Sequence, residues 1–176
     1  MNIKVDENAW LRSLELNDLV QYRPLHHQPE LEELLVGWNF PLNKAEQEKW
    51  YLSQPMKSNT QRFSFFVQDN WAGFAGLWGI DWKDRYAEIG LALAPGNQGH
   101  GYGKKIILAI SRFAFDTLNL NRIETEILGY NEASNRAFQR CGYELEGVQK
   151  KKVFKRGAYQ DLNLLAILRE NYAPDA

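Results

Sequence analysis

Cysteine is almost missing from this sequence, because Cys141 is the only one among 176 residues. A single cysteine excludes an intrachain disulfide and a zinc site built from several thiolates. Reactive cysteines need an accessible, electropositive setting, so the simplest interpretation of Cys141 is a buried thiol that packs like a small apolar side chain. We therefore expect neither disulfide chemistry nor a bound metal.

Long apolar runs and an excess of charge of one sign are also missing. No segment approaches the roughly 18 apolar residues of a membrane-spanning helix, and residues 1–10 lack the apolar stretch of a signal peptide. The formal net charge is only −1, so no global positive field draws the protein toward nucleic acid or an anionic membrane. We expect a cytoplasmic protein with neither a nucleic-acid nor a membrane partner.

What the chain does have is the composition of a globular protein, with 44% hydrophobic and 24% charged residues. Its length suits one domain with a substantial core better than two small ones. We therefore predict a single domain over residues 1–176, with its core at about 10–168.

Short helices are expected in the first third of the chain. A short strand near Trp10 precedes residues 19–35, where Pro24 and Pro29 interrupt the helical spacing and indicate two short helices. Residues 43–52 predict a further short helix with a capping residue at its start.

The rest of the chain alternates between strands and helices. Segments rich in β-formers at 62–67, 71–80 and 85–93 predict three consecutive antiparallel strands. The remaining predicted elements are a helix over 102–118, a strand around 123–127, a helix over 131–140 and a hairpin over 143–168 that turns at Arg156-Gly157. The strand, helix and strand from 85 to 127 form the unit that produces parallel pairing.

A glycine-rich loop, APGNQGHGYGKK at residues 94–105, lies between a predicted strand and an amphipathic helix. Such a loop can turn several backbone N–H groups toward an anion at the positive end of the helix, which suits a phosphate or pyrophosphate. A Walker loop requires a hydroxyl residue in place of Lys105, and a dinucleotide fingerprint requires glycine in place of Lys104. Neither of these nucleotide motifs is present.

The remaining pattern, Q-x-x-G-x-G from Gln98 to Gly103, resembles the GCN5-related N-acetyltransferases (GNAT), whose equivalent loop holds the CoA pyrophosphate. N-x-x-S-N-x-x-F at 131–138, CGYELEG at 141–147 and G-x-Y-x-D at 157–161 are similar to the RimJ/RimL-like subgroup, which acetylates ribosomal-protein N-termini. The resemblance implies an α/β (α+β) fold with a central mixed, mostly antiparallel sheet of about six or seven strands flanked by helices. A parallel strand-helix-strand pair would form the acetyl-CoA cleft.

The same resemblance implies where acetyl-CoA, the expected co-substrate, would bind. In relatives, backbone groups of the strand before the glycine loop pair with pantetheine like an added strand. The implied cofactor-binding residues are Leu91, Ala92, Leu93, Gln98, Gly99, His100, Gly101, Tyr102, Gly103, Lys104, Asn131 and Phe138.

Catalysis of this type is a direct attack by the amine on the thioester in a ternary complex, so positioning matters greatly. Glu88 is the candidate general base, acting through a water, and its alternative interpretation is an exposed strand charge or a salt-bridge partner. Asp81 and Asp161 are alternatives. Ser134 matches a serine proposed to protonate the CoA thiolate, and its alternative interpretation is a helix-surface serine. Phe138 stands where many relatives carry a tyrosine for that task.

The acceptor amine is not fixed by the sequence. Trp38, Phe40 and Asp81 are the predicted substrate-binding residues, and Trp78 and Trp82 are further aromatic candidates. The acceptor would be a protein N-terminal α-amine or a small amine such as a polyamine, an amino sugar or an aminoglycoside. Two other function classes stay open: a CoA-binding sensor without turnover, and a nucleotide-binding domain for another phosphate cofactor. A homodimer is possible.

Overall fold

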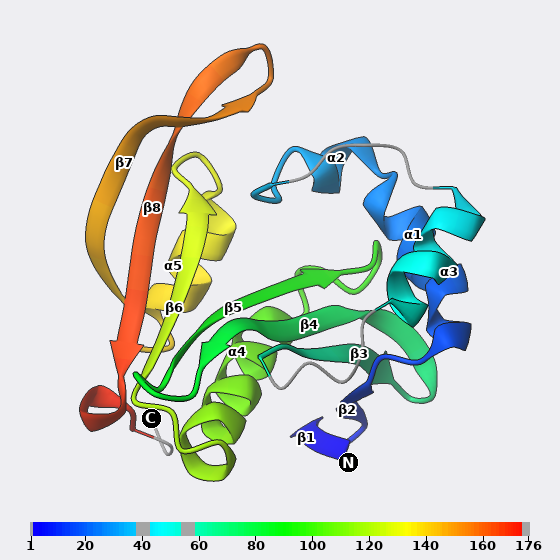
Figure 1. Ribbon diagram of the computed structural model, residues 1–176, viewed down its shortest axis with the longest axis horizontal. Helices are drawn as coiled ribbons and strands as arrows, with labels where there is room; N and C mark the ends of the chain where they lie inside the picture. Colours follow the sequence, from blue (N-terminus) through cyan, green and yellow to red (C-terminus); the bar gives the residue numbers. More distant parts are fainter. Residues whose placement is uncertain (1, 38–42, 54–58, 174–176) are drawn as a thin grey trace.

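The computed structural model describes residues 2–37, 43–53 and 59–173, and its centre is a twisted sheet (Figure 1). The sheet has eight strands in these residues, in the order β1-β2-β3-β4-β5-β6-β8-β7. The strands are β1 (Asn2–Asp6), β2 (Ala9–Ser13), β3 (Gln61–Val67), β4 (Asn70–Asp81), β5 (Tyr86–Leu93), β6 (Arg122–Leu128), β7 (Glu144–Lys155) and β8 (Ala158–Leu168). Every neighbouring pair is antiparallel except β5–β6. The predicted mixed, mostly antiparallel sheet is confirmed.

The helices also follow the predicted order. They are α1 (Leu19–His26), α2 (Pro29–Glu32), α3 (Lys44–Leu52), α4 (Tyr102–Arg112) and α5 (Glu132–Gln139), with 3-10 turns at Leu16–Asp18 and Arg169–Asn171 and a π-helical turn at Phe113–Thr117. Pro24 lies near the end of α1, and Pro29 is the first residue of α2, where its missing N–H costs nothing. The two short helices expected over 19–35 are therefore confirmed.

Strand β1 is the one strand that the sequence pattern did not indicate. It pairs with β2, and Ile3 and Val5 pack against the main core. Helix α4 lies over β1, and the Lys105 ammonium forms an ion pair with the Asp6 carboxylate at 2.5 Å. Two apolar residues among five give too weak an alternation to predict a strand, and its stability comes from tertiary packing.

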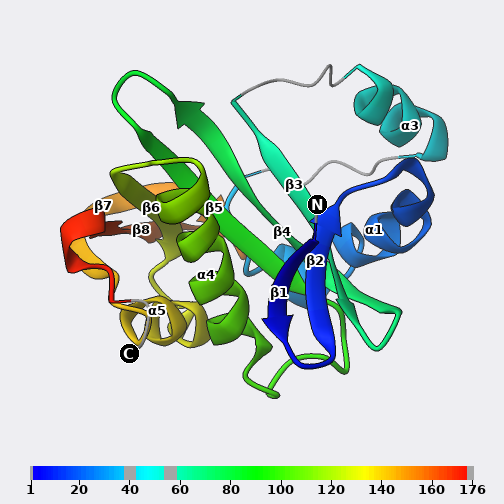
Figure 2. The same ribbon diagram turned by 90° about the horizontal axis from the view of Figure 1, so that it is seen from below.

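Helices pack on both faces of the sheet. The main core lies on the face covered by α4 and α5, where Ile106, Ile107 and Ile110 are almost fully buried. Figure 2 shows these two helices side by side. Burying each such isoleucine contributes about 1.5–3 kcal/mol. On the opposite face a smaller cluster joins Leu25 and Leu31 of the N-terminal helices to residues of β4 and β5.

Strands β5 and β6 separate shortly after they meet. They pair in parallel at Tyr86–Arg122, Ala87–Ile123 and Glu88–Glu124, and no register pair follows in the described residues. Beyond this point β5 continues beside β4, and β6 continues beside β8, so the two strands diverge in Figure 1. We call this divergence the strand fork. It confirms the predicted parallel strand-helix-strand unit.

Candidate active site at the strand fork

The edge of β5 that faces the strand fork has backbone groups without a neighbouring strand. Residues 89–93 pair with β4 on one side only. Leu91 and Leu93 pack toward the main core, whereas Ala92 belongs to the smaller cluster on the other face. An extended ligand can therefore add to this edge through backbone hydrogen bonds, as an added strand does.

The glycine-rich loop continues directly from this edge of β5. Gly96, Gly99 and Gly101 have φ values of +81°, +80° and +79°, a left-handed conformation that glycine adopts without strain. A side chain at these positions would meet open space, so the backbone conformation is the reason for glycine. The Gln98 amide donates to the Leu93 carbonyl at 3.3 Å and ties the loop to β5.

Helix α4 begins at the end of this loop, with Gly101 as its N-cap. The free N–H groups of a first helical turn favour an anion such as pyrophosphate. Lys104, in that turn, is exposed and forms no ion pair with a described residue, whereas Lys105 is held by Asp6. The loop and the helix start therefore offer a cradle with one available cation.

Side chains of the core pack against the start of α4. Tyr102 is partly buried and packs edge-on against Phe65, while His100 is exposed. The Cys141 thiol contacts the Lys104 carbonyl at 3.7 Å, and burial raises its pKa to about 11. The prediction that Cys141 is a buried thiol is confirmed.

Helix α5 presents its N-terminus to the side of the fork formed by β6. Asn131 is the N-cap: its side-chain oxygen accepts from the Ser134 N–H at 3.2 Å. The Asn131 amide nitrogen donates to the Leu34 carbonyl at 3.3 Å. Ser134 is half-buried, but Phe138 is 3% exposed and packs edge-on against Tyr143 in the main core. The α5 residues expected beside the cofactor thus divide, with Phe138 serving the core.

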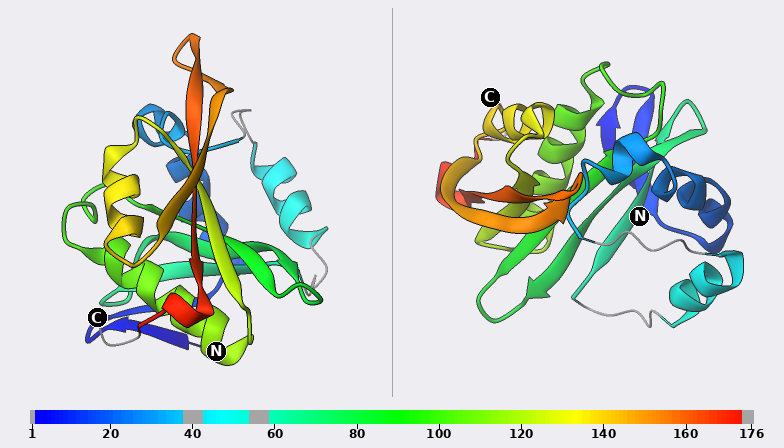
Figure 3. Two further views of the ribbon diagram at one scale, coloured as in Figure 1. Left: turned by 90° about the vertical axis from the view of Figure 1, so that its left-hand side faces the viewer. Right: turned by 90° about the horizontal axis from the view of Figure 1, so that it is seen from above.

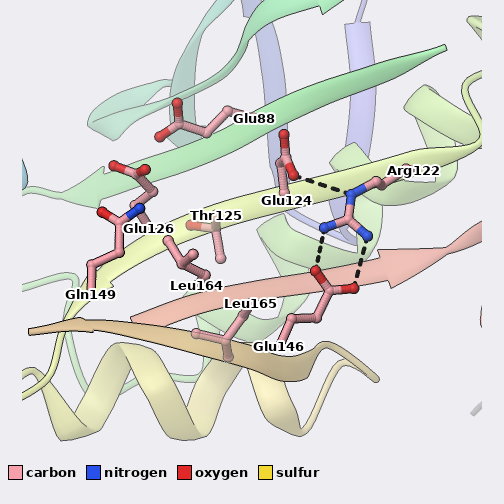
Figure 4. Close-up of a pocket in the computed structure, with 9 residues that line it drawn as sticks. All are labelled: Glu88, Arg122, Glu124, Thr125, Glu126, Glu146, Gln149, Leu164 and Leu165. Atoms are coloured by element: carbon pink, nitrogen blue, oxygen red, sulfur yellow. Dashed lines mark hydrogen bonds and ion pairs between the residues drawn. The ribbon is translucent and has the colours of Figure 1, made fainter. Parts of the chain in front are cut away.

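A pocket of about 190 Å³ opens at the base of the fork (Figure 4). Its lining comes from β5, β6, β7 and β8: Glu88, Arg122, Glu124, Thr125, Glu126, Glu146, Gln149, Leu164 and Leu165. We call it the fork pocket. Four of these side chains carry carboxylates and one is a guanidinium, so the pocket is acidic.

The positive charge in the fork pocket is already engaged. Arg122 donates to Glu124 at 3.1 Å and, in bidentate fashion, to Glu146. This guanidinium lowers the pKa of Glu146. By contrast, Glu88 and Glu126 form no hydrogen bond or ion pair with a described residue. Two carboxylates of the pocket therefore have no counter-ion in the part of the chain that the structure describes.

Glu88 has the electrostatic setting expected of a proton acceptor. It is the last β5 residue paired with β6, and its side chain still reaches solvent. Partial burial removes water from the Glu88 carboxylate and raises its pKa, and the negative charges of Glu126 and Glu124 raise this pKa further. A raised pKa makes a carboxylate a stronger base, provided that it is ionised at working pH.

Trp78 stands beside Glu88 on the neighbouring strand. The two residues are register partners between β4 and β5, and the indole ring lies against Gly76 and Gly90. A methyl group at Gly90 would lie 3.0 Å from that ring, which explains why this position is glycine. Of the aromatic candidates for the amine site, Trp78 is the one that the structure places next to Glu88.

Asp81 and Asp161, the other acidic candidates, do not line the fork pocket. Trp38 and Phe40 lie outside the described residues. The Asp81 carboxylate accepts from the backbone N–H groups of Lys83 and Asp84 at 2.9 and 2.8 Å, so it caps the turn between β4 and β5. Asp161, the other alternative base, is occupied by the Lys150 ammonium.

Four lining residues of the fork pocket were not predicted from the sequence: Glu124, Glu126, Glu146 and Gln149. A local signal for two of them existed in β6, where Ile123, Thr125 and Ile127 are buried and the alternate residues are acidic. That alternation placed two carboxylates on one face, but not beside Glu88. Their meeting depends on the parallel pairing of β5 with β6.

The tips of the two arms of the fork are bridged by residues 29–35, which we call the α2 segment. Arg156, in the turn between β7 and β8, forms an ion pair with Glu33 and lies over the Tyr130 ring. The Tyr130 hydroxyl donates to the Glu33 carbonyl, and the buried Lys155 donates to the Glu32 carbonyl at 2.8 Å. Figure 3 shows the hairpin tip beside α2.

Comparison with known proteins decides the family. A family model described as the acetyltransferase (GNAT) domain matches residues 8–144. The chain belongs to the GNAT acetyltransferases. It is an acetyl-CoA-dependent N-acetyltransferase, as the glycine loop and the α5 motif predicted. In the described part of this acetyltransferase, no helix is long and apolar enough to cross a membrane.

Similar members of the family act on different amines, as their names state. Spermidine N(1)-acetyltransferase of Vibrio cholerae is 28% identical over 92% of this chain and 94% of its own length. Ribosomal-protein-serine acetyltransferase of Escherichia coli is 31% identical over 93% of this chain and 94% of its own length. The crystal structure of the Vibrio cholerae spermidine N-acetyltransferase with CoA and spermine has a TM-score of 0.91 at 26% identity, covering 95% of this chain and 99% of that one.

Proposed function

We propose that this acetyltransferase transfers the acetyl group of acetyl-CoA to a primary amine of a small polycation of the polyamine class. One observation carries the proposal: the acidic fork pocket lies where β5 and β6 diverge, and two of its carboxylates have no counter-ion among the described residues. A polyamine supplies several ammonium groups without any anion, so its charge complements this pocket. The similarity to spermidine acetyltransferases supports the same acceptor class.

The CoA-binding role is assigned to the opposite side of the fork. The glycine-rich loop and the first turn of α4 would hold the pyrophosphate, with Lys104 as a cation, and the edge of β5 at 89–93 would hold the pantetheine. This arrangement brings the acetyl group toward Glu88 at the base of the fork. When bound, acetyl-CoA supplies the activated acyl group, and the protein positions it against the amine.

The acceptor amine must lose a proton before it attacks. A side-chain-like amine with a pKa near 10.4 costs about 4.6 kcal/mol to deprotonate at pH 7, whereas an α-amine near 7.8 costs about 1.1 kcal/mol. A polyamine therefore needs a general base more than a protein N-terminus does. Glu88 would take this proton through a water, because it lies where β5 and β6 last pair and has no counter-ion among the described residues.

The transfer forms one bond and breaks another. The amine nitrogen bonds to the acetyl carbon, the carbon–sulfur bond of the thioester breaks, and the CoA sulfur leaves with the electron pair. A proton must then reach this sulfur. Ser134 is the candidate donor or hydrogen-bond partner, because it lies in the first turn of α5 and Phe138 has no proton to give. Neither side chain forms a covalent intermediate in this scheme.

The test is a thiol-release assay with acetyl-CoA and a panel of acceptors: spermidine, spermine, putrescine, amino sugars, aminoglycosides and N-terminal peptides. We expect turnover with polyamines and little with peptides. Preferential turnover of peptides that begin with serine would contradict the polyamine assignment and favour the ribosomal-protein type of acceptor. Tight CoA binding without turnover of any acceptor would favour the sensor instead.

A further inference from the structure

The charges of the fork pocket divide into a balanced group and an unbalanced pair. Arg122 holds Glu124 and Glu146 through three hydrogen bonds, so their charge is largely compensated. Glu88 and Glu126 have no such partner among the described residues. If Glu88 serves the reacting amine, Glu126 is the carboxylate whose charge the transfer step does not use.

Strand geometry fixes the separation between these two carboxylates. Glu124 is the register partner of Glu88, and Glu126 lies two residues further along β6 on the same face. Two residues of a strand span about 6.6 Å. Beyond Glu124 the two strands diverge, which carries Glu126 away from Glu88 rather than alongside it. A ligand that reaches both needs two positive charges joined by a short spacer.

An unsatisfied amide oxygen lies at the same end of the pocket as Glu126. The Oε1 atom of Gln149 is buried and accepts no hydrogen bond from the described residues. Figure 4 shows the Gln149 amide near the Glu126 carboxylate, at the opposite end of the pocket from the Arg122–Glu146 pair. A buried acceptor without a donor costs free energy unless a ligand supplies the missing N–H. Independently of the carboxylates, it therefore points to a ligand rich in hydrogen-bond donors.

The surface on the far side of Glu126 from Glu88 suits a further carbon segment of such a ligand. Leu164 on β8 is the register partner of Glu126 and lines the pocket. Methylene groups that leave water to cover this leucine gain about 0.8 kcal/mol for each fully buried CH₂. An amino sugar or an aminoglycoside has hydroxyl-bearing rings in place of such methylene groups and gains less from this apolar surface.

We infer that Glu126 is a specificity-determining residue. Together with the side-chain amide oxygen of Gln149, it binds a second, non-reacting ammonium of the acceptor. The inference rests on the proposed function, because it assigns Glu88 to the reacting amine. The fork pocket then selects linear diamines and polyamines over monoamines. Recognition at Glu126 acts mainly on acceptor binding, and the bond-making step stays with Glu88.

The test compares Glu126→Gln with wild type in steady-state kinetics on spermidine, 1,3-diaminopropane and propylamine. For the two polycations we expect KM to rise by about tenfold to a hundredfold, the usual weight of one hydrogen bond to a charged group. The kcat at saturation should change little, and kcat/KM for propylamine should stay within about twofold of wild type. Glu126→Asp, which keeps the charge on a shorter side chain, should recover part of the affinity.

Glu144→Gln is the matched control, because Glu144 is an exposed β7 carboxylate outside the fork pocket and its loss changes net charge equally. An unchanged preference for diamines over propylamine in Glu126→Gln would overturn the inference, as would an equal loss in Glu144→Gln. Calorimetry of spermidine binding to the CoA complex separates the role of Glu126 in binding from the proposed acetyl transfer to polyamines. Binding that depends on Glu126 without turnover would retain the inference and reject acetyl transfer to polyamines. Absence of both spermidine binding and turnover would reject the role of Glu126 and the polyamine function together.

Discussion

The two sides of the strand fork are built in different ways. On the side proposed for the cofactor, the edge of β5 and the glycine-rich loop come from one continuous stretch, 89–105, and offer mainly backbone groups. On the side proposed for the acceptor, the fork pocket collects side chains from β5, β6, β7 and β8. A backbone site is constrained by conformation, whereas a side-chain site changes with each substitution. The difference indicates how a family retains one cofactor while its acceptors diverge.

The largest expected effect is on kcat, and it follows from substitution of Glu88. Glu88→Gln should lower kcat by about 10²- to 10⁴-fold, the usual contribution of general base catalysis, because a neutral amide accepts no proton at working pH. The affinity for CoA should stay unchanged, because Glu88 lies outside the glycine-rich loop. Stopped-flow kinetics with saturating spermidine and calorimetry with CoA measure the two quantities. A wild-type kcat in this variant would remove Glu88 from the mechanism.

The converse change acts on the cofactor side. Gly101→Ala forces an L-residue into a left-handed conformation at the start of α4, which costs about 1–2 kcal/mol. We expect CoA affinity to fall by about tenfold and the KM for the acceptor to stay the same, as measured by calorimetry and kinetics.

Gly157→Ala provides the control for strain alone. It places alanine at a similar φ of +70° in the hairpin turn between β7 and β8. That variant should lose stability without losing CoA affinity. Equal losses of CoA affinity in both variants would show that the loop conformation has no special role in binding.

A smaller effect concerns the pH dependence of activity, which depends on electrostatic coupling between carboxylates of the fork pocket. Activity should rise with pH as Glu88 ionises, and the negative charges of Glu126 and Glu124 displace this rise upward by raising the pKa of Glu88. Arg122 and Glu146 also face this pocket but largely compensate each other. Glu126→Gln should therefore move the acid limb of the kcat profile to lower pH. A shift in the opposite direction would contradict the electrostatic coupling between β5 and β6.

The smallest effect is on stability. A carboxyl group whose pKa is raised in the folded state ionises first in the unfolded chain, so its ionisation opposes folding above its ordinary pKa. Glu88→Gln removes this opposition, and we expect a modest rise in Tm at pH 7 that disappears near pH 4. Thermal unfolding at both pH values measures it, with Glu144→Gln as the reference variant. A fall in Tm at pH 7 would mean that the Glu88 charge is stabilised in the fold.

The same contrast explains how much of this molecule could be predicted from the sequence. The alternation of strands and helices, the loop at 94–105 and the parallel unit were predictable because each depends on local spacing. Strand β1 was not, since its two core-facing residues matter only under α4. The fork pocket was also missed, because Glu88 and Glu126 meet only through the pairing of two strands that are far apart in sequence. The capping role of Asp81 likewise depends on the turn that follows it.

Bridges at both ends hold the arms of the fork at a fixed separation. Paired backbones join them at the base, and at the tips Leu31 packs with Ala92 of β5 while Glu33 binds Arg156 of the hairpin. The opening between the arms is thus closed at the base by strand pairing and at the tips by the α2 segment. These contacts lie within the chain itself, so they form when the chain folds and not when a substrate binds. The entropic cost of forming these contacts falls on folding, and affinity is correspondingly less reduced.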